Sequence, residues 1–278
     1  MTELLRTEFY HLIEARHGHF LANPKDNYLG GSMIRYGEFS EIEWMLLDQL
    51  IHPGNVVVEA GANMGVFTVP IAKKVGRRGM VYAFEPQMTI FQQLCANLAL
   101  NDLVNVQAFN AGCGDESAWL PIRRVDPARS TNFGGLSLKM LESQSPVRVR
   151  VERLDDVLDV SRLNLIKADV EGMELQVLRG ASGLIKQHRP RLYLEANEPE
   201  GSAELYDLLT GWDYRLFWHL PPMYNPENHA GDGENIFGRT ISMNILCLPA
   251  EQGARIKRFR AVSGRGDHPK LWGKAKEA

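Results

Sequence analysis

Three residues near position 60 have types and spacings that could bind a ligand. The β-branched run Val56–Val58 leads to an acid, Glu59, and two glycines follow, Gly61 and Gly65. A helical pattern begins directly after them, so the order predicts a strand, a tight turn and a helix N-terminus. Glycine has no Cβ, so a ligand can approach the backbone closely, and a helix N-terminus favours electron-rich groups. The segment therefore predicts a ligand-binding turn.

A second acid lies where a nucleoside site would need one. Glu85 ends an apolar run and follows Gly65 by 20 residues, which leaves room for one crossover helix. An acid at the end of the second strand of a βαβ unit can accept the hydroxyl protons of a ribose. We therefore predict a ribonucleoside site, with Glu85 on the ribose. Asn110 and Ala111, just past the next strand, would lie beside the adenine, although an ordinary Asx turn also explains Asn110.

The same residues indicate which nucleoside is bound. A dinucleotide motif has the form G-x-G-x-x-G; this chain lacks the middle glycine, and Glu59 would lie unfavourably beside a pyrophosphate. S-adenosylmethionine has an ammonium group, a sulfonium and a ribose, but no phosphate. We expect Glu59 to hold its ammonium end, while Gly61 and Gly65 admit its methionine part. Asn63 would either bond this donor or cap the helix.

Two alternatives to a catalytic site for S-adenosylmethionine stay open. One is an NAD-dependent oxidoreductase, and the other is a non-catalytic protein that binds S-adenosylmethionine for scaffolding or regulation. The acids at later strand ends favour catalysis over simple binding only weakly.

Acids also gather after two later strands. Asp169, Glu171 and Glu174 follow one apolar run, and Glu195 ends the next. Burying acids together is costly without a cation, and the methyl donor carries one; we therefore expect Asp169 beside its sulfonium. Asp169 and Glu195 could instead hold Mg²⁺ through oxygen ligands. The rest of the chain has no metal signature, so we do not predict a metal.

Methyl transfer to a hydroxyl group needs alignment of the reactants and removal of one proton. The candidate bases are Glu171, Glu195 and His219, and Asp169 completes the set of candidate catalytic residues. His219 follows an apolar-aromatic run at a predicted strand end, where a merely packed or surface histidine is the alternative. The long loop after it contains amide, acidic and aromatic side chains, which suit a sugar or polyol acceptor but are also common in ordinary loops.

Alternating apolar runs and helical patterns make up the middle of the chain. They predict a mostly parallel sheet with right-handed crossovers, and ligands bind beyond the carboxyl ends of the strands in such sheets. This rule places the acids at 59, 85, 169 and 195 along one edge. The predicted strands are 56–59, 81–85, 104–109, 163–169 and 191–195, and the predicted helices are 66–74, 87–100, 171–179 and 202–210.

The fold class that follows is α/β and Rossmann-like: a mostly parallel sheet with an antiparallel final strand and helices on both faces. The final antiparallel pair is predicted over 215–218 and 242–248, and an inserted hairpin over 118–122 and 147–151. We divide the chain into an N-terminal helical extension, a core domain and a basic C-terminal tail that we expect to be solvated. Their bounds are 1–52, 53–250 and 251–278.

Two helices are predicted in the N-terminal extension. Leu5, Phe9, Leu12 and Ile13 fall on one helical face, which favours an amphipathic helix over 2–17. Ser40 is a typical N-cap for a second helix that reaches about Ile51. The apolar face expected to pack on the sheet consists of Ile42, Met45, Leu46 and Ile51.

Composition narrows the classes of partner. A net charge of −3 over 278 residues argues against a general nucleic-acid or membrane-surface binder. Three widely spaced cysteines form neither a zinc pattern nor a disulfide framework, which fits a cytoplasmic protein. The N-terminus has no apolar signal region, and no apolar run approaches the roughly 18 residues of a membrane span. We expect a small-molecule or glycan acceptor, no nucleic acid and no membrane; the oligomeric state stays open.

Five segments of the chain carry a resemblance to a known family. They are YGE at 36–38, EAGANMG at 59–65, AFEP at 83–86, NLALN at 97–101 and IKADVEGME at 166–174. On these segments the sequence from about Tyr36 to Pro249 resembles the FkbM-type family of S-adenosylmethionine-dependent methyltransferases. The resemblance implies a class I methyltransferase fold and methyl transfer, usually to a hydroxyl oxygen of a natural product such as a polyketide, a sugar or a glycan. It does not identify the acceptor.

Overall fold

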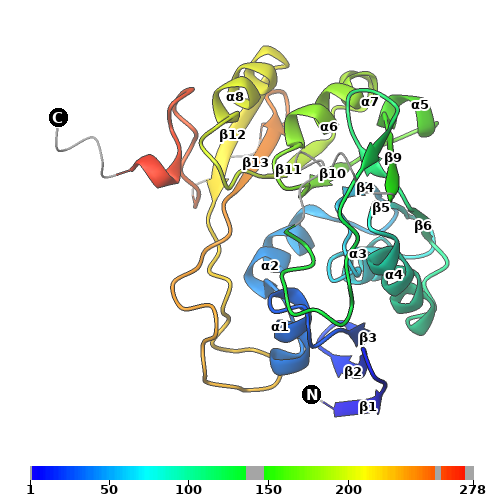
Figure 1. Ribbon diagram of the computed structural model, residues 1–278. Coiled ribbons are helices and arrows are strands. Elements are labelled where there is room, and N and C mark those ends of the chain that lie inside the picture. The colour runs from blue at the N-terminus through cyan, green and yellow to red at the C-terminus, as the bar shows by residue number, and fades with distance from the viewer. Residues whose placement is uncertain (1, 136–146, 254–257, 273–278) are drawn as a thin grey trace.

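The computed structural model describes residues 2–135, 147–253 and 258–272 (Figure 1). Its centre is a seven-stranded sheet with the order β12-β13-β11-β10-β4-β5-β6. The pairings β11–β10, β10–β4, β4–β5 and β5–β6 are parallel, while β13 runs antiparallel to both β11 and β12. The strands are β4 (Val56–Ala60), β5 (Met80–Phe84), β6 (Val106–Phe109), β10 (Leu165–Ala168), β11 (Arg191–Glu195), β12 (Tyr214–His219) and β13 (Asn244–Pro249).

This architecture confirms the predicted fold class, a class I methyltransferase fold with an antiparallel final strand. Because β4 is covered on both faces, its side chains pack alternately into two cores. Val57 belongs to the core that contains α3 and α4, whereas Val56 and Val58 belong to the core that contains α6 to α8. The helices of the domain are α3 (Thr68–Val75), α4 (Met88–Leu100), α5 (Leu154–Val157), α6 (Glu174–Gly180), α7 (Ser182–His188) and α8 (Ser202–Gly211).

The N-terminal extension begins with a small antiparallel sheet, so the helix predicted over 2–17 is wrong. Ile13, Ala15, Phe20 and Ala22 are buried at alternate positions, which is the period of a strand. Gly18, at φ +139°, follows the tight turn between the second and third strands. The elements are β1 (Thr2–Arg6), β2 (His11–Ala15), β3 (Gly18–Ala22), α1 (Leu29–Tyr36) and α2 (Glu41–Leu50).

The helix α2 begins after Ser40 as predicted, although no Ser40 side-chain hydrogen bond caps it. Its predicted apolar face is only partly correct, since Ile51 is buried and Leu46 packs against the same core. Met45 is 57% exposed, whereas Trp44 and Leu47 are buried. Two acids of this helix, Glu41 and Glu43, are also buried. A hydrophobicity pattern cannot identify an acid that faces inward, because the cause is a partner elsewhere in the fold.

Two further segments lie outside the seven-stranded sheet, a second small sheet and the C-terminal tail. The predicted hairpin is confirmed as β8 (Ala118–Pro121) and β9 (Arg148–Glu152), and β7 (Gly112–Cys113) pairs with β9 as well. The tail is not simply solvated: within 258–272, Val262 N donates to Leu216 O at 2.9 Å and Trp218 N donates to Arg260 O at 2.8 Å. The described part of the tail contains a short 3₁₀ helix, Pro269–Leu271. None of the described helices is long and apolar enough to cross a membrane.

Candidate active site

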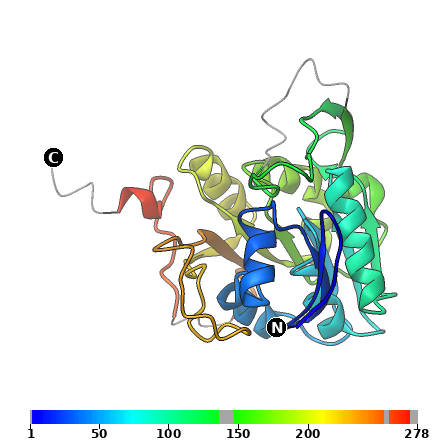
Figure 2. The ribbon, with the colours of Figure 1, turned by 60° about the horizontal axis from the view of Figure 1, so that its bottom comes forward.

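A cavity of about 440 Å³ opens at the carboxyl ends of the parallel strands. The segments that follow β4, β5, β6, β10 and β11 form one half of its wall. The N-terminal extension and the long loop 220–243 form the other half. Figure 2 shows this end of the molecule from below, with α1 in front of the sheet. We call the two parts the strand-loop half and the extension half.

The glycine turn after β4 lies on the wall of the strand-loop half. Gly61 has φ +83°, and a Cβ at this position would lie 1.9 Å from Asp169 O, so only glycine fits. Asn63 also lines the cavity in a left-handed conformation, with φ +48°. Gly65 has φ +92°, but its Cβ would meet the Leu94 side chain. Its lack of a side chain therefore serves packing against α4.

Glu85 lines the same half with a buried carboxyl group, 5% exposed. Its Oε2 accepts the Asn63 N–H at 3.0 Å, and its Oε1 accepts the Gln87 N–H at 2.8 Å. Burial raises the pKa of Glu85 to about 7 although both N–H groups oppose the shift. A carboxylate offers about four lone-pair sites, so each oxygen can accept a further hydroxyl proton.

The other residues that were predicted to contact S-adenosylmethionine lie behind this wall. Glu59 is 1% exposed and its Oε2 accepts the Thr68 hydroxyl at 2.7 Å; burial raises its pKa to about 7. Asn110 Nδ2 donates to the carbonyls of Glu85 and Pro86, both at 3.0 Å, and Ala111 packs into the core. None of the three is part of the cavity wall among the described residues, which Gly112 and Cys113 line instead.

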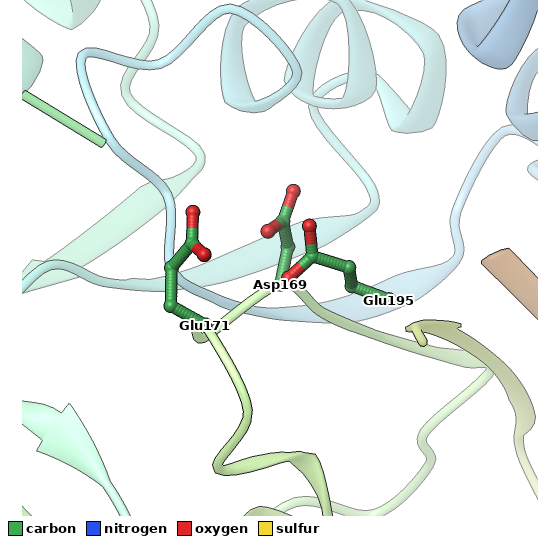
Figure 3. Close-up of side chains that lie close together, drawn as sticks. All are labelled: Asp169, Glu171 and Glu195. Atoms are coloured by element: carbon green, nitrogen blue, oxygen red, sulfur yellow. The ribbon is translucent and has the colours of Figure 1, made fainter. Parts of the chain in front are cut away.

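Three carboxyl groups converge at the ends of β10 and β11 (Figure 3). Asp169, Glu171 and Glu195 each offer an oxygen, and these atoms lie within 4.8 Å of one another. Burial, reinforced by Asp169 and Glu171, raises the pKa of Glu195 to about 11. Burial and the neighbouring acids raise the pKa of Glu171 to about 7. Glu174 turns away, because its Oε1 accepts the N–H groups of Val170 and Gly172.

A buried cation beside these acids was not predicted as a site residue. Lys167, 2% exposed, lies in the middle of the sheet, and its Nζ is 3.3 Å from Asp169 Oδ2 and 4.0 Å from Glu43 Oε1. Burial opposes its charge, but Asp169, Glu43 and Glu59 together raise the pKa of Lys167 above its ordinary value. Burial also raises the pKa of Glu43 to about 7. The sequence signal for Lys167 was a lysine inside an otherwise apolar strand.

His219 lies away from the cavity wall in the described structure. It is 7% exposed, its Nδ1 is 2.7 Å from the Tyr193 hydroxyl, and its ring packs edge-on against Phe259. Burial lowers the pKa of His219 to about 4. This environment is that of a packed histidine, the alternative that the sequence left open.

Comparison with known proteins identifies the family to which this chain is similar. The sequence pattern of the methyltransferase FkbM domain matches residues 59–216. Methyltransferase 1 of Beauveria bassiana is 32% identical over 45% of this chain and 57% of its own length. Methyltransferase sdnD of Sordaria araneosa is 31% identical over 52% of this chain and 67% of its own length.

A solved structure of similar description also matches. The methyltransferase FkbM from Methylobacillus flagellatus is 20% identical over 71% of this chain and 48% of its own, with a TM-score of 0.46. The chain thus spans about half to two thirds of the proteins that it matches. Because the domain pattern covers more than half of the chain, from the acid of the glycine turn to β12, this protein belongs to the FkbM methyltransferase family.

Proposed function

We propose that the protein is an S-adenosylmethionine-dependent methyltransferase that methylates a hydroxyl group. The observation that carries the proposal is the Glu85 carboxyl group, which is buried on the cavity wall beside the Gly61 turn and has lone pairs free for two ribose hydroxyls. Family membership supports the choice of a methyl donor over NAD. The sulfonium of the bound donor supplies an activated methyl group and a good leaving group.

The residues of the strand-loop half suit this donor. Gly61 lets the turn after β4 pack against the Asp169 backbone, which holds the turn on the cavity wall where the methionine part would lie, and Glu85 suits the ribose. Asn63 and Cys113 are on the wall where the rest of the nucleoside would lie. Four predicted residues lie behind the wall: Glu59, Gly65, Asn110 and Ala111. Glu59 would act through its electrostatic field, Gly65 through close packing against α4, and Asn110 by fixing the loop that follows Glu85.

The acid cluster suits proton removal from the acceptor hydroxyl. A general base works best when its pKa lies near the working pH, and Glu171 has a pKa near 7 and lines the cavity. Burial and the neighbouring acids raise the pKa of Glu195 as well, so the cluster would retain a proton; we propose that Glu195 carries it as a hydrogen-bond donor and that Glu171 is the base. Asp169, paired with Lys167, would face the sulfonium, and His219 has no role in this mechanism.

A methyl-transfer assay tests this function. Labelled S-adenosylmethionine is incubated with aryl glycosides, simple sugars and polyketide alcohols, and the product is analysed for label on oxygen. We expect at least one hydroxylated acceptor to gain a methyl ether, and we expect EDTA to leave the rate unchanged. Label on nitrogen or carbon would contradict O-methylation. Loss of activity with EDTA, restored by Mg²⁺, would instead make Asp169 and Glu195 metal ligands.

A further inference from the structure

The extension half of the cavity combines an apolar wall with residues from two distant parts of the chain. Tyr28 and Phe39 come from the N-terminal extension, and Met223 and Ile241 come from the long loop 220–243. Tyr36, Met223 and Phe237 form one hydrophobic cluster with Tyr28 and Phe39 packed against it. Neither segment makes this wall alone, so whatever binds here depends on how they are joined.

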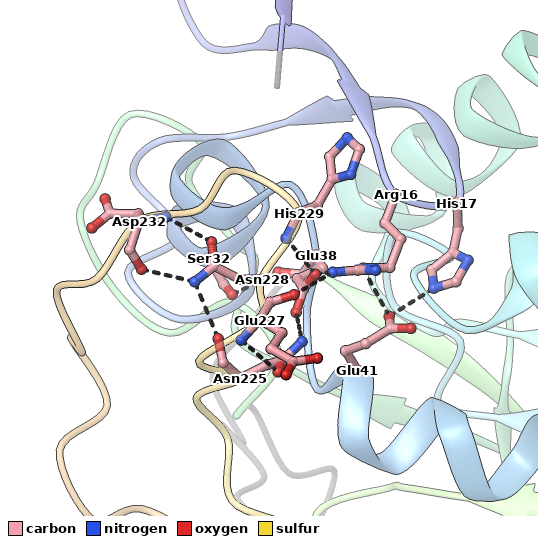
Figure 4. A network of polar contacts seen from close by, with 10 residues as sticks. All are labelled: Arg16, His17, Ser32, Glu38, Glu41, Asn225, Glu227, Asn228, His229 and Asp232. Atoms are coloured by element: carbon pink, nitrogen blue, oxygen red, sulfur yellow. Dashed lines mark hydrogen bonds and ion pairs between the residues drawn. The ribbon is translucent and has the colours of Figure 1, made fainter.

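Glu38 joins them (Figure 4). This carboxyl group is 4% exposed, and its Oε2 accepts Arg16 Nε at 2.6 Å and the backbone N–H of His229 at 2.8 Å. Its Oε1 accepts the Asn225 amide at 2.8 Å. A buried carboxylate with three donors is costly to disturb, because the loss of one leaves charged or polar groups unpaired.

A second contact fixes the same loop. The Tyr36 hydroxyl donates to Glu234 O at 2.6 Å and accepts the Ile236 N–H at 2.9 Å. Glu38 therefore contacts the loop at 225 and 229, and Tyr36 contacts it at 234 and 236. We call these two residues and their partners the Glu38 clamp.

The charge around the cavity limits what this wall can bind. Six acidic and only two basic side chains line it in the described structure. Burial and the neighbouring Asp169 and Glu171 raise the pKa of Glu195, so a further negative charge in this cluster is unfavourable. An anionic acceptor would add like charge to this site, which costs several kcal/mol in typical interfaces. The acids are Glu43, Glu85, Asp169, Glu171, Glu195 and Glu198, and the bases are Lys167 and Lys270.

We infer that the extension half binds an uncharged, hydroxylated acceptor with an apolar face, and that Glu38 is the positioning residue for it. The inference rests on the proposed function, since it names the acceptor class of that site. The apolar wall favours a ring or chain face, while the hydroxyl groups of Ser40, Thr240 and Ser242 on the same wall can hydrogen-bond to acceptor hydroxyls. We therefore expect phosphorylated sugars and nucleic acids to bind more weakly than uncharged acceptors.

Binding of two matched probes tests this inference. Protein saturated with S-adenosylhomocysteine is titrated with 4-nitrophenyl β-glucoside, which is neutral, and with 4-nitrophenyl phosphate, which is anionic, by ligand-observed NMR. We expect the glucoside to bind at least roughly tenfold more tightly. Equal or tighter binding of the phosphate, or binding of neither probe, would overturn the inference. S-adenosylhomocysteine binding is measured first, so its absence would count against the proposed function instead.

The Glu38→Gln variant tests the clamp. The amide replaces an acceptor oxygen with a donor, so one of its three donors must lose its partner. We expect glucoside binding to fall roughly tenfold and S-adenosylhomocysteine binding to change less than twofold. Glu251→Gln is the matched control, because Glu251 also accepts an arginine but is exposed and lies outside the cavity wall. Tyr36→Phe repeats the test if Glu38→Gln does not fold. Unchanged glucoside binding in a folded variant would remove the clamp from the acceptor site.

Discussion

The two halves of the cavity are built in different ways. In the strand-loop half, Glu85 is bound by Asn63 and Gln87, which lie 22 and 2 residues away along the chain. In the extension half, Glu38 is bound by Asn225 and His229, which lie 187 and 191 residues away. Local turns hold the first half, and long-range polar pairs hold the second. We therefore expect donor binding and acceptor binding to respond to different substitutions.

The largest expected effect is the loss of donor binding in Gly61→Val. The new Cβ would collide with Asp169 O, and φ +83° strains any side chain there. Calorimetry with S-adenosylhomocysteine should detect no binding, while circular dichroism verifies the fold. Gly54→Val is the matched control, since Gly54 has φ +84° but no atom within 4 Å of its Cβ position. Normal binding by a folded Gly61→Val would mean that this turn does not contact the donor.

The second-largest expected effect is on turnover, and it distinguishes Glu171 from Glu195 within the acid cluster. Glu171→Gln should lower turnover by about 10²–10⁴-fold, the usual contribution of a positioned base. Glu195→Gln should lower it much less, because the amide imitates the protonated carboxyl group that our assignment gives to Glu195, whose pKa is raised by burial and by the neighbouring acids. Steady-state kinetics at pH 7.5 with the acceptor found by the screen compares the two. A larger defect in Glu195→Gln would reverse the assignment of the base.

Glu85→Ala should weaken binding at the methyl-donor site without changing binding of the acceptor. Losing hydrogen bonds to a charged group costs roughly 1.5–3 kcal/mol of binding free energy. Calorimetry with S-adenosylhomocysteine measures this cost, and the aryl glucoside should bind as in the wild type. Weaker glucoside binding at saturating S-adenosylhomocysteine would show that the two halves are coupled. It would contradict the expectation that donor binding and acceptor binding respond to different substitutions.

The smallest effect concerns stability. Because burial raises the pKa of Glu59 from 4.5 in its ordinary state to about 7, the folded chain holds a proton that the unfolded chain has lost between these pH values. The free energy of unfolding therefore falls as pH rises through this window. Between pH 5.5 and 7.5, urea unfolding of Glu59→Gln should show a fall smaller than that of wild type by roughly 2 kcal/mol. The control variant Glu251→Gln should show the same fall as wild type. If Glu59→Gln also shows the wild-type fall, Glu59 does not hold the extra proton in this pH range.

The sequence predicted the strand-loop half far better than the extension half. Glu85 could be placed because a strand, a glycine turn and a 20-residue spacing are all local signals. Leu12 and Ile13 fitted a helical face, but the burial of Ile13 and Phe20 comes from packing of the small sheet against α4, which no local pattern reveals.

Residues with distant partners were the ones that sequence reasoning missed. Glu43 faces inward because Lys167 lies beside it, and Glu38 is buried because Arg16 and the long loop surround it. A single sequence contains no signal for such pairs, since each member alone is an ordinary surface residue type. Only the lysine inside an apolar strand was a visible anomaly.

Calorimetric titration of the wild-type protein with S-adenosylhomocysteine and, separately, with NAD⁺ tests the central claim most directly. We expect saturable binding of S-adenosylhomocysteine at one site per chain and no binding of NAD⁺, because the glycine turn lacks the middle glycine of a dinucleotide motif and the Glu59 carboxyl group, 1% exposed, lies behind it. Saturable binding of NAD⁺ without binding of S-adenosylhomocysteine would contradict the claim.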